Sequence, residues 1–153
     1  MAVRYRRRQW GVVAIATCLG SGTLGAVLLW NAGHGAVAIA LLATELVIAM
    51  LFSSLTVEVG DGELRWFFGP GLWRHRVALD AITEIGVVRN RWWHGLGVGI
   101  VLGIRFHTVS GLDAVELRIR CGEVHRIGTD DPHGLAAAIR AACASAQRAA
   151  QGV

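Results

Sequence analysis

The sequence predicts an α+β, mostly β chain: an N-terminal transmembrane helical hairpin, then a partly open seven-stranded barrel with a C-terminal capping helix. The chain has 153 residues, is 54% hydrophobic and has a mean hydropathy of +0.48, which is too apolar for an ordinary soluble domain. Two long apolar runs open it, and short alternating segments and one amphipathic segment follow. We therefore expect a membrane anchor over 1–55 and a second domain over 56–153.

The two apolar runs are each long enough to cross a bilayer. The run from Trp10 to Trp30 has about 21 residues without a charge, and that from Ala36 to Leu55 has about 20, enough for about 30 Å of hydrocarbon. The short turn at 31–35 makes the two helices antiparallel. The first run is preceded by four arginines, Arg4, Arg6, Arg7 and Arg8, so the positive-inside rule predicts a multi-pass cell-membrane protein with both termini cytoplasmic.

Two alternatives concern the first run. A cleaved signal peptide would also place arginines before an apolar segment, but this run is longer than a usual signal h-region and a second span follows. Small residues at Ala16 and Gly20, and at Ser21 and Gly25, allow close helix approach. We favour packing within the hairpin, where the partner helix is already tethered, over self-association into a homo-oligomer.

Glu45 lies near the middle of the second predicted span. A lone carboxylate at that depth is costly unless it is protonated or faces a polar group, and Ser21 and Thr17 on the first span are candidate partners. The sharper hypothesis is a proton or cation site. We favour a neutral interhelical contact, because one carboxylate in two helices makes a poor pathway.

The segment after the anchor alternates apolar and polar residues with a period of two. Asp61-Gly62 indicates a hairpin that puts Val57 opposite Trp66 and Glu58 opposite Arg65. A second hairpin, turning at 120–122, puts His125 beside Leu117 as a core histidine. The further expected elements are strands over 73–79, 83–91 and 100–107, and a helix capped by Asp131 that runs from Pro132 to about Ala150.

Enzyme chemistry finds little support in the sequence. There is no HExxH, C-x-x-C or G-x-S-x-G motif, no lysine for a Walker A loop, and the three cysteines are far apart. We therefore expect no catalytic residue, metal or cofactor. From Thr56 onward 11 arginines balance 10 acidic residues, which also argues against nucleic-acid binding by this part.

The stretches 55–85, 87–97 and 110–139 resemble bacterial pleckstrin-homology-like (PH-like) proteins that carry an N-terminal two-helix membrane anchor. The segments 111–117 and 126–132 are the most specific. The resemblance implies a PH-like barrel with a capping helix and no catalytic residues. One departure concerns lipid binding: the loop between the first two strands is long and basic in phosphoinositide-binding PH domains, and here it is the tight, acidic 60–62.

One cluster of arginine, tryptophan and histidine is a candidate binding surface. If the third and fourth predicted strands pair, its two segments meet at one end of the barrel, where arginine and tryptophan suit a membrane interface or a protein hot spot. The alternative is that the tryptophans fill the core and the arginines are solvated. The candidate residues are Arg74, Arg76, Arg89, Arg91, Trp92, Trp93 and His94.

The sequence thus predicts a non-enzymatic, membrane-tethered binding or adaptor module at the cytoplasmic leaflet. Its hairpin contacts membrane lipids, and its barrel engages an unknown protein partner or the bilayer surface. Two rival functions stay open: a small oligomeric proton or ion conductor built around Glu45, and an enzyme that uses the scattered histidines.

Overall fold

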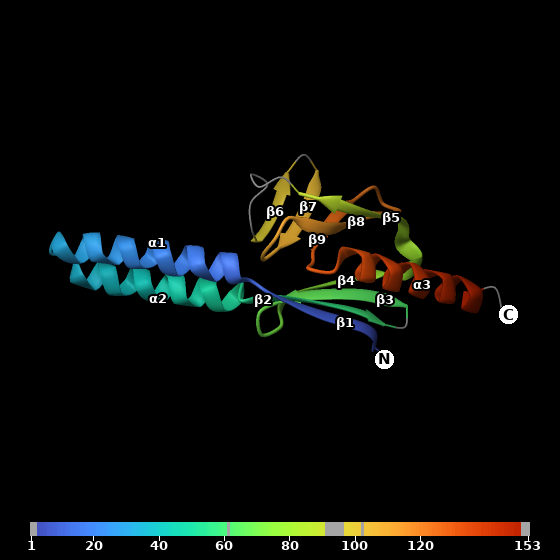
Figure 1. Cartoon of the computed structure of the whole chain (residues 1–153), viewed down its shortest axis with the longest axis horizontal. Coiled ribbons are helices and arrows are strands. Elements are labelled where there is room, and N and C mark those ends of the chain that lie inside the picture. The colour runs from blue at the N-terminus through green and yellow to red at the C-terminus, as the bar shows by residue number, and fades with distance from the viewer. Residues whose placement is uncertain (1–2, 61, 91–96, 102, 151–153) are drawn as a thin grey trace.

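The structure, a computed structural model, describes residues 3–60, 62–90, 97–101 and 103–150. Helices at the N-terminal side project as a rod from a domain made of two sheets and a third helix (Figure 1). In chain order the elements are β1 (Val3–Trp10), α1 (Val12–Asn31), α2 (Gly35–Leu51), β2 (Ser54–Gly60), β3 (Glu63–Phe68), β4 (Leu72–Ala78), the 3-10 helix η1 (Leu79–Ala81), β5 (Ile82–Arg89), β6 (Gly97–Val101), β7 (Ile104–Thr108), β8 (Asp113–Ile119), β9 (Val124–Gly128) and α3 (Pro132–Ala150).

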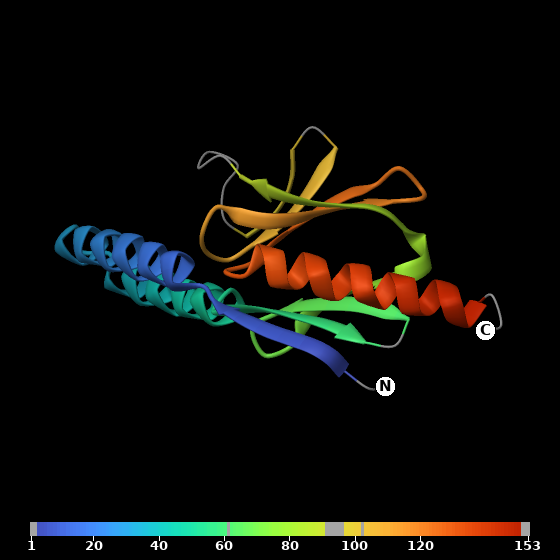
Figure 2. The same cartoon turned by 45° about the vertical axis from the view of Figure 1, so that its right-hand side comes forward.

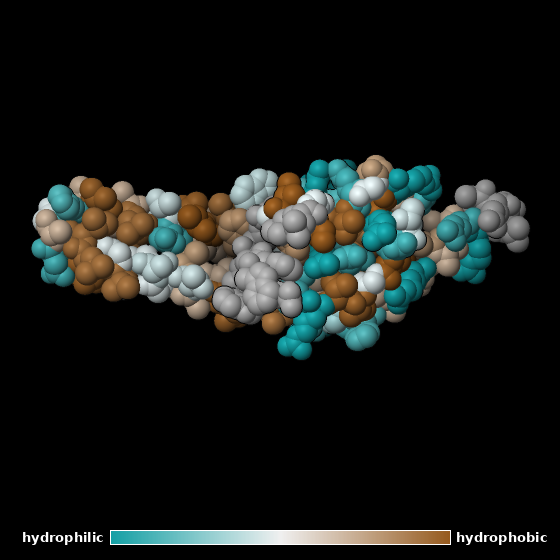
Figure 3. All heavy atoms as spheres, turned by 90° about the horizontal axis from the view of Figure 1, so that it is seen from above, coloured by the Kyte–Doolittle hydropathy of each residue, from teal (hydrophilic) through white to brown (hydrophobic). Residues whose placement is uncertain are grey.

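α1 and α2 lie side by side (Figure 1), and the face of them seen in Figure 3 is mostly apolar. Gly22, Ala26 and Ala38 are buried where the helices meet, as small residues at a close contact should be. Among the described helices, α1 alone is long and apolar enough to cross a membrane, while α2 is apolar but shorter. The second span was predicted over 36–55, but the helix ends at Leu51.

That helix ends early because the chain after it belongs to a sheet. Ser54 starts β2, and Leu55, which was assigned to the span, is 1% exposed in the core of the domain. Alternate side chains of a strand face opposite sides, so the alternation from Leu55 to Val59 already fits β structure. The apolar run is therefore the sum of a helix and the first residues of a buried strand.

β1 is a strand that the sequence pattern does not predict. It contains the arginine cluster and pairs antiparallel with β2, with Trp10 opposite Ser54 and Arg6 opposite Glu58. The pairing continues up to the helices, since the Gly11 amide donates to the Ser53 carbonyl at 2.8 Å. α1 and α2 are thus inserted between two neighbouring strands, and the predicted boundary at 55/56 divides strands that pair with each other.

The strands form two sheets and do not close into a barrel within the described residues. One sheet has the order β1-β2-β3-β4, the other β5-β8-β9-β7-β6, and η1 connects them (Figure 2). Seven strands were predicted, but β1 is additional and the strand expected over 100–107 is instead the hairpin β6–β7. Gly103, with a φ of +79°, lies in that turn, where glycine has no steric cost.

The predicted registers of the two hairpins are confirmed. Val57 faces Trp66 and Glu58 faces Arg65 across β2 and β3, and Leu117 faces His125 across β8 and β9. Asp61 of the first turn lies outside the described residues. These registers could be predicted because only one alignment brings apolar side chains onto one face of each pair.

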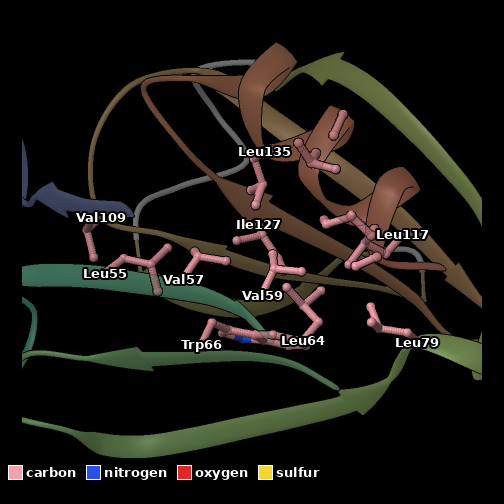
Figure 4. Packing of buried hydrophobic residues seen from close by; sticks show 14 of the residues in the cluster. Leu55, Val57, Val59, Leu64, Trp66, Leu79, Val109, Leu117, Ile127 and Leu135 are labelled. Atoms are coloured by element: carbon pink, nitrogen blue, oxygen red, sulfur yellow. The ribbon is translucent and has the colours of Figure 1, made fainter. Parts of the chain in front are cut away.

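The core lies between the two sheets and α3. Figure 4 shows side chains of β2 and β3 pointing towards those of β8, β9 and α3. α3 begins as predicted: the Gly134 amide donates to Asp131 Oδ1 at 2.9 Å, and Leu135 and Ile139 are fully buried. This packing leaves the other face of the β1–β4 sheet uncovered by any described helix or strand.

Candidate functional site on the outer face of the first sheet

The structure separates the residues of the predicted arginine and tryptophan cluster. Arg74 and Arg76 lie on β4 in the first sheet, whereas Arg89 ends β5 in the second. β4 pairs with β3, and β5 with β8, so the pairing that would have united the cluster does not form. The remaining candidates, Arg91, Trp92, Trp93 and His94, lie outside the described residues.

The β4 arginines instead join residues of β2 and β3. Leu64, Trp66 and Phe68 are buried in the core, so the alternate residues Arg65 and Phe67 face outward. A hollow with a volume of about 250 Å³ lies among these side chains of β2, β3 and β4. It is lined by Glu58, Arg65, Trp66, Phe67, Arg74, His75 and Arg76.

β1 extends this basic face. Its Tyr5 and Arg7 lie opposite buried Val59 and Val57, so Arg6 and Arg8 point to the outer side. Arg6 forms an ion pair with Glu58 at 3.2 Å. The Arg8 guanidinium lies over the Trp10 ring, 4.4 Å from its centroid, a cation–π contact that holds both side chains against the sheet.

The inner side of β1 fixes the strand to the rest of the domain. Arg7 makes two charge-assisted hydrogen bonds to Asp130, of 3.0 and 2.9 Å, just before α3. The Tyr5 hydroxyl donates to Asp131 at 3.4 Å, and Gln9 Nε2 donates to the Ser110 carbonyl at 2.8 Å. These bonds hold β1, and with it the start of α1, in a fixed position on the domain.

The outer face carries an excess of positive charge. Among its described residues, the carboxylates of Glu58 and Glu63 pair with Arg6 and Arg65, the latter at 2.6 Å. The other three arginines, Arg8, Arg74 and Arg76, form no ion pair with a carboxylate of the described residues. An anionic group is the natural complement of such a surface.

A bulge places Trp73 and Arg74 next to the end of α2. Trp66 pairs with His75 and Phe68 with Leu72, so two residues of β4 oppose the single residue Phe67. Trp73 is 57% exposed and has a φ of 48°; its ring centroid lies 5.6 Å from that of Phe52, which follows α2. The bulge thus aims an indole outward at the level where the helices end.

The β3–β4 turn is packed tightly on α2. A Cβ on Gly69 would lie 2.7 Å from the Leu51 carbonyl oxygen and 2.8 Å from that of Met50, closer than real contacts allow. Only glycine fits there, and its φ of +50° is also one that glycine adopts without cost. The arginine-bearing strand and the end of the helix are therefore fixed relative to each other.

Three histidines form a second cluster, between the two sheets. His75 comes from β4, His107 from β7 and His125 from β9, with ring centroids of His75 and His107 4.8 Å apart. His107 Nε2 lies 3.3 Å from His125 Nδ1, and His125 Nε2 lies 3.3 Å from Glu123. If His125 donates to the carboxylate, its Nδ1 accepts from His107, and His107 Nδ1 is left as a buried acceptor without a partner among the described residues.

This environment keeps the histidines neutral. Burial lowers the pKa of His107, and together with smaller contributions from His75, His125 and Arg105 it brings this pKa to about 3. Burial also lowers the pKa of His75 and of His125, the latter against the raising effect of Glu123. The prediction that His125 is a core histidine is confirmed, at 4% exposure. Among the described residues, no group of three or more histidine, cysteine or acidic side chains has the geometry to hold a metal ion.

Glu45 contacts different residues from those that we expected. The Ser21 and Thr17 hydroxyls donate to the backbone carbonyls of Thr17 and Val13, one turn earlier in their own helix. The Glu45 side chain instead lies against Gly22, where an added Cβ would be 2.8 Å from its Cγ, and it interacts with the Cys18 thiol. Glu45 thus packs between the helices.

Sequence reasoning missed three arginines of the outer face. Arg6 and Arg8 were interpreted only as a topology signal, because the arginine-rich segment has no apolar alternation that would reveal a strand. Arg65 was placed correctly opposite Glu58 but was not connected to Arg74 and Arg76. The predicted hairpin register already put Arg65 on the solvent side, and this was the one indication in the sequence that Arg65 belongs to the outer face.

The outer face can bind an anion through guanidinium groups, while its described residues offer no nucleophile held by a base. Comparison with protein-family models gave no match, and neither did comparison with curated proteins.

Proposed function

We propose that this chain is a non-enzymatic binding module tethered to the cytoplasmic face of the cell membrane. α1 and α2 anchor it as a membrane hairpin, and the two-sheet domain binds a protein partner or the bilayer surface. The observation that carries the proposal is the insertion of the apolar helices between paired strands β1 and β2, with Gly11 hydrogen-bonded to Ser53 at the junction (Figure 1).

The apolar surface of the helices supports the membrane anchor. Large hydrophobic side chains, among them Leu24, Leu28 and Leu46, are more than 60% exposed. Exposure of so much apolar surface to water is energetically unfavourable. α1 has the length of a span, and α2, at about 26 Å by its helical rise, falls slightly short of about 30 Å of hydrocarbon. Such a mismatch costs fractions of a kcal/mol per Å and is accommodated by local thinning of the bilayer.

The pairing of β1 with β2 supports a shared side for both ends of the helical pair. Hydrogen-bonded neighbours lie on the same side of any membrane that the intervening helices enter. Segments next to membrane spans carry an excess of lysine and arginine on the cytoplasmic side, and β1 is rich in arginine. Together these features favour two crossings with the domain in the cytoplasm.

The proposed PH-like relationship rests on the resemblance of the sequence and on the order of elements. Meandering antiparallel strands form one sheet, a second sheet follows, and a C-terminal helix packs against the core that they share. The resemblance implies no catalytic residues, which supports a binding role, although fold alone does not supply a function.

Membrane fractions test this proposal. After a wash in alkaline carbonate, the full chain should stay in the pellet, because the helices are embedded in lipid. A reporter that is active only outside the cytoplasm, fused after Val153, should be silent, and a reporter active only inside should work. Release of the chain by carbonate would contradict the anchor, and activity of the outside reporter would contradict the cytoplasmic domain.

A further inference from the structure

We propose that the outer face of the β1–β4 sheet binds the phosphate of an anionic phospholipid in the leaflet next to the domain. Arg8 and Arg74 are the principal contacts, and Trp10 and Trp73 flank them. The inference rests on the proposed function and goes beyond it, because it names the ligand and the residues that hold it.

The distance from the helix ends selects these two arginines. Arg8 lies two residues before Trp10, and Arg74 lies two residues after Leu72, the residue that pairs with Phe68 beside α2. At about 3.3 Å per residue of strand, Arg8 lies about 7 Å beyond Trp10, taken as the hydrocarbon boundary. Arg8 pairs with Thr56 and Thr56 with Phe67, which the bulge sets opposite Trp73 and Arg74, so Arg74 lies at the same level of the sheet. The polar layer on each side of a bilayer is about 5–7 Å thick, so both guanidiniums reach phosphates.

The pattern of ion pairs points to the same end of the sheet. The two carboxylates of this face pair with Arg6 and Arg65, which lie farther from the helices. Arg8 and Arg74, nearer the helices, have no carboxylate partner among the described residues, whereas of Arg6, Arg65 and Arg76, farther away, only Arg76 lacks one. Arg74 Nε donates to the Gly71 carbonyl at 2.8 Å, and its guanidinium lies 5.9 Å from the Phe67 centroid, so the side chain is held in place with donors to spare. Positive charge is thus least compensated where the lipid phosphates would lie.

The tryptophans fit the same position. Trp10 and Trp73 are 58% and 57% exposed, at the level where α1 begins and α2 ends. Indole rings prefer the membrane–water interface, where one edge is apolar and the other is wet. The left-handed backbone of Trp73 is the kind of local strain that persists where a side chain has a role at a surface.

The experiment measures lipid selectivity of the full chain. The protein in detergent is mixed with equal amounts of dioctanoyl phosphatidylglycerol and dioctanoyl phosphatidylcholine, and native mass spectrometry counts the bound lipids. We expect a strong preference for phosphatidylglycerol. In R8Q/R74Q this preference should fall about thirtyfold, since two arginines at about 1 kcal/mol each contribute about 2 kcal/mol.

Two further variants distinguish binding at this site from a general effect of the positive charge of the protein. R8K/R74K keeps the charge and should keep most of the preference, while R148Q removes an exposed arginine near the C-terminal end of α3 and should change nothing. If R8Q/R74Q does not fold, R74Q alone answers the question, since Arg74 is an exposed side chain.

The outcomes are distinct for the two proposals. Equal binding of both lipids by the wild type, an unchanged preference in R8Q/R74Q, or an equal loss in R148Q would each overturn the lipid site. A chain that stays in carbonate-washed membranes yet shows no lipid preference leaves the anchored module intact. A chain that carbonate releases overturns both.

Discussion

Trp73 has a backbone φ of 48°, in the left-handed region that costs most residues about 1–2 kcal/mol. Replacement by glycine removes this strain, whereas replacement by alanine keeps it. Both changes remove the contact of the indole with Phe52. We therefore expect W73G to be more stable than W73A by about 1 kcal/mol, measured by thermal unfolding of the full chain in detergent. Equal stability of the two variants would show that the backbone at this bulge is not strained.

His107 makes the stability of the domain depend on pH. Its folded-state pKa of about 3 lies below its ordinary value of 6.5, so between these values the unfolded chain binds the proton more readily. Stability is therefore fully present above pH 6.5 and is lost as the pH falls towards 3. The loss approaches about 1.4 kcal/mol per pH unit for this one group.

The test of this pH dependence is thermal unfolding of the full chain at several pH values from 7.5 downward. H107F replaces the imidazole by a ring of similar size beside Trp66 and should flatten the dependence. Part of the slope should remain, since His75 and His125 also have lowered pKa values. H133F changes an exposed histidine of α3 and should behave as the wild type. An H107F slope equal to that of the wild type would contradict the assignment.

At the scale of elements, the pairing of β1 with β2 determines how the helices can be removed without disrupting the domain. Because Gly11 and Ser53 are hydrogen-bonded opposite each other, the helices can be replaced by a two-residue turn. A variant in which Asn-Gly replaces residues 12–52 keeps both strands in register. We expect it to be soluble and to unfold cooperatively.

A chain that starts at Ser54 is the matched comparison. It lacks β1 and the bonds from Arg7 to Asp130, so it leaves β2 as an uncovered edge over an apolar core. We expect it to unfold at a lower temperature than the Asn-Gly variant and to aggregate more. Should the two behave alike, as judged by size-exclusion chromatography and thermal unfolding, β1 would contribute nothing to the domain.

The elements that could be predicted are those whose side chains alternate in hydrophobicity. The register of β2 with β3 and the cap of α3 at Asp131 follow from local pattern alone. β1 could not be recognised, because its inner residues Tyr5, Arg7 and Gln9 are polar and find their partners far along the chain. The turn at Gly103 was missed because the apolar run continues through it.

At the scale of the whole molecule, the arrangement of the strands into two sheets depends on contacts that no short window contains. β7 pairs in parallel with β9, and the second sheet begins only after η1 turns the chain. The same holds for the candidate site. Composition identified Arg74 and Arg76, but the residues that line the hollow with them come also from two other strands, β2 and β3. Trp92 and Trp93, the other half of the predicted surface, lie outside the described residues.

The pairing of β1 with β2 also sets an order of events during synthesis. β1 leaves the ribosome first, and its partner follows only after both helices have been made, which takes several seconds at about 5–20 residues per second. During this interval β1 has unpaired backbone groups. Its arginines keep it soluble and, under the proposed membrane anchor, would keep it from following the helices into lipid. A β1 made of β-branched, apolar residues would form the same backbone hydrogen bonds with β2. Before β2 had been synthesised, however, such a strand would aggregate or enter the membrane.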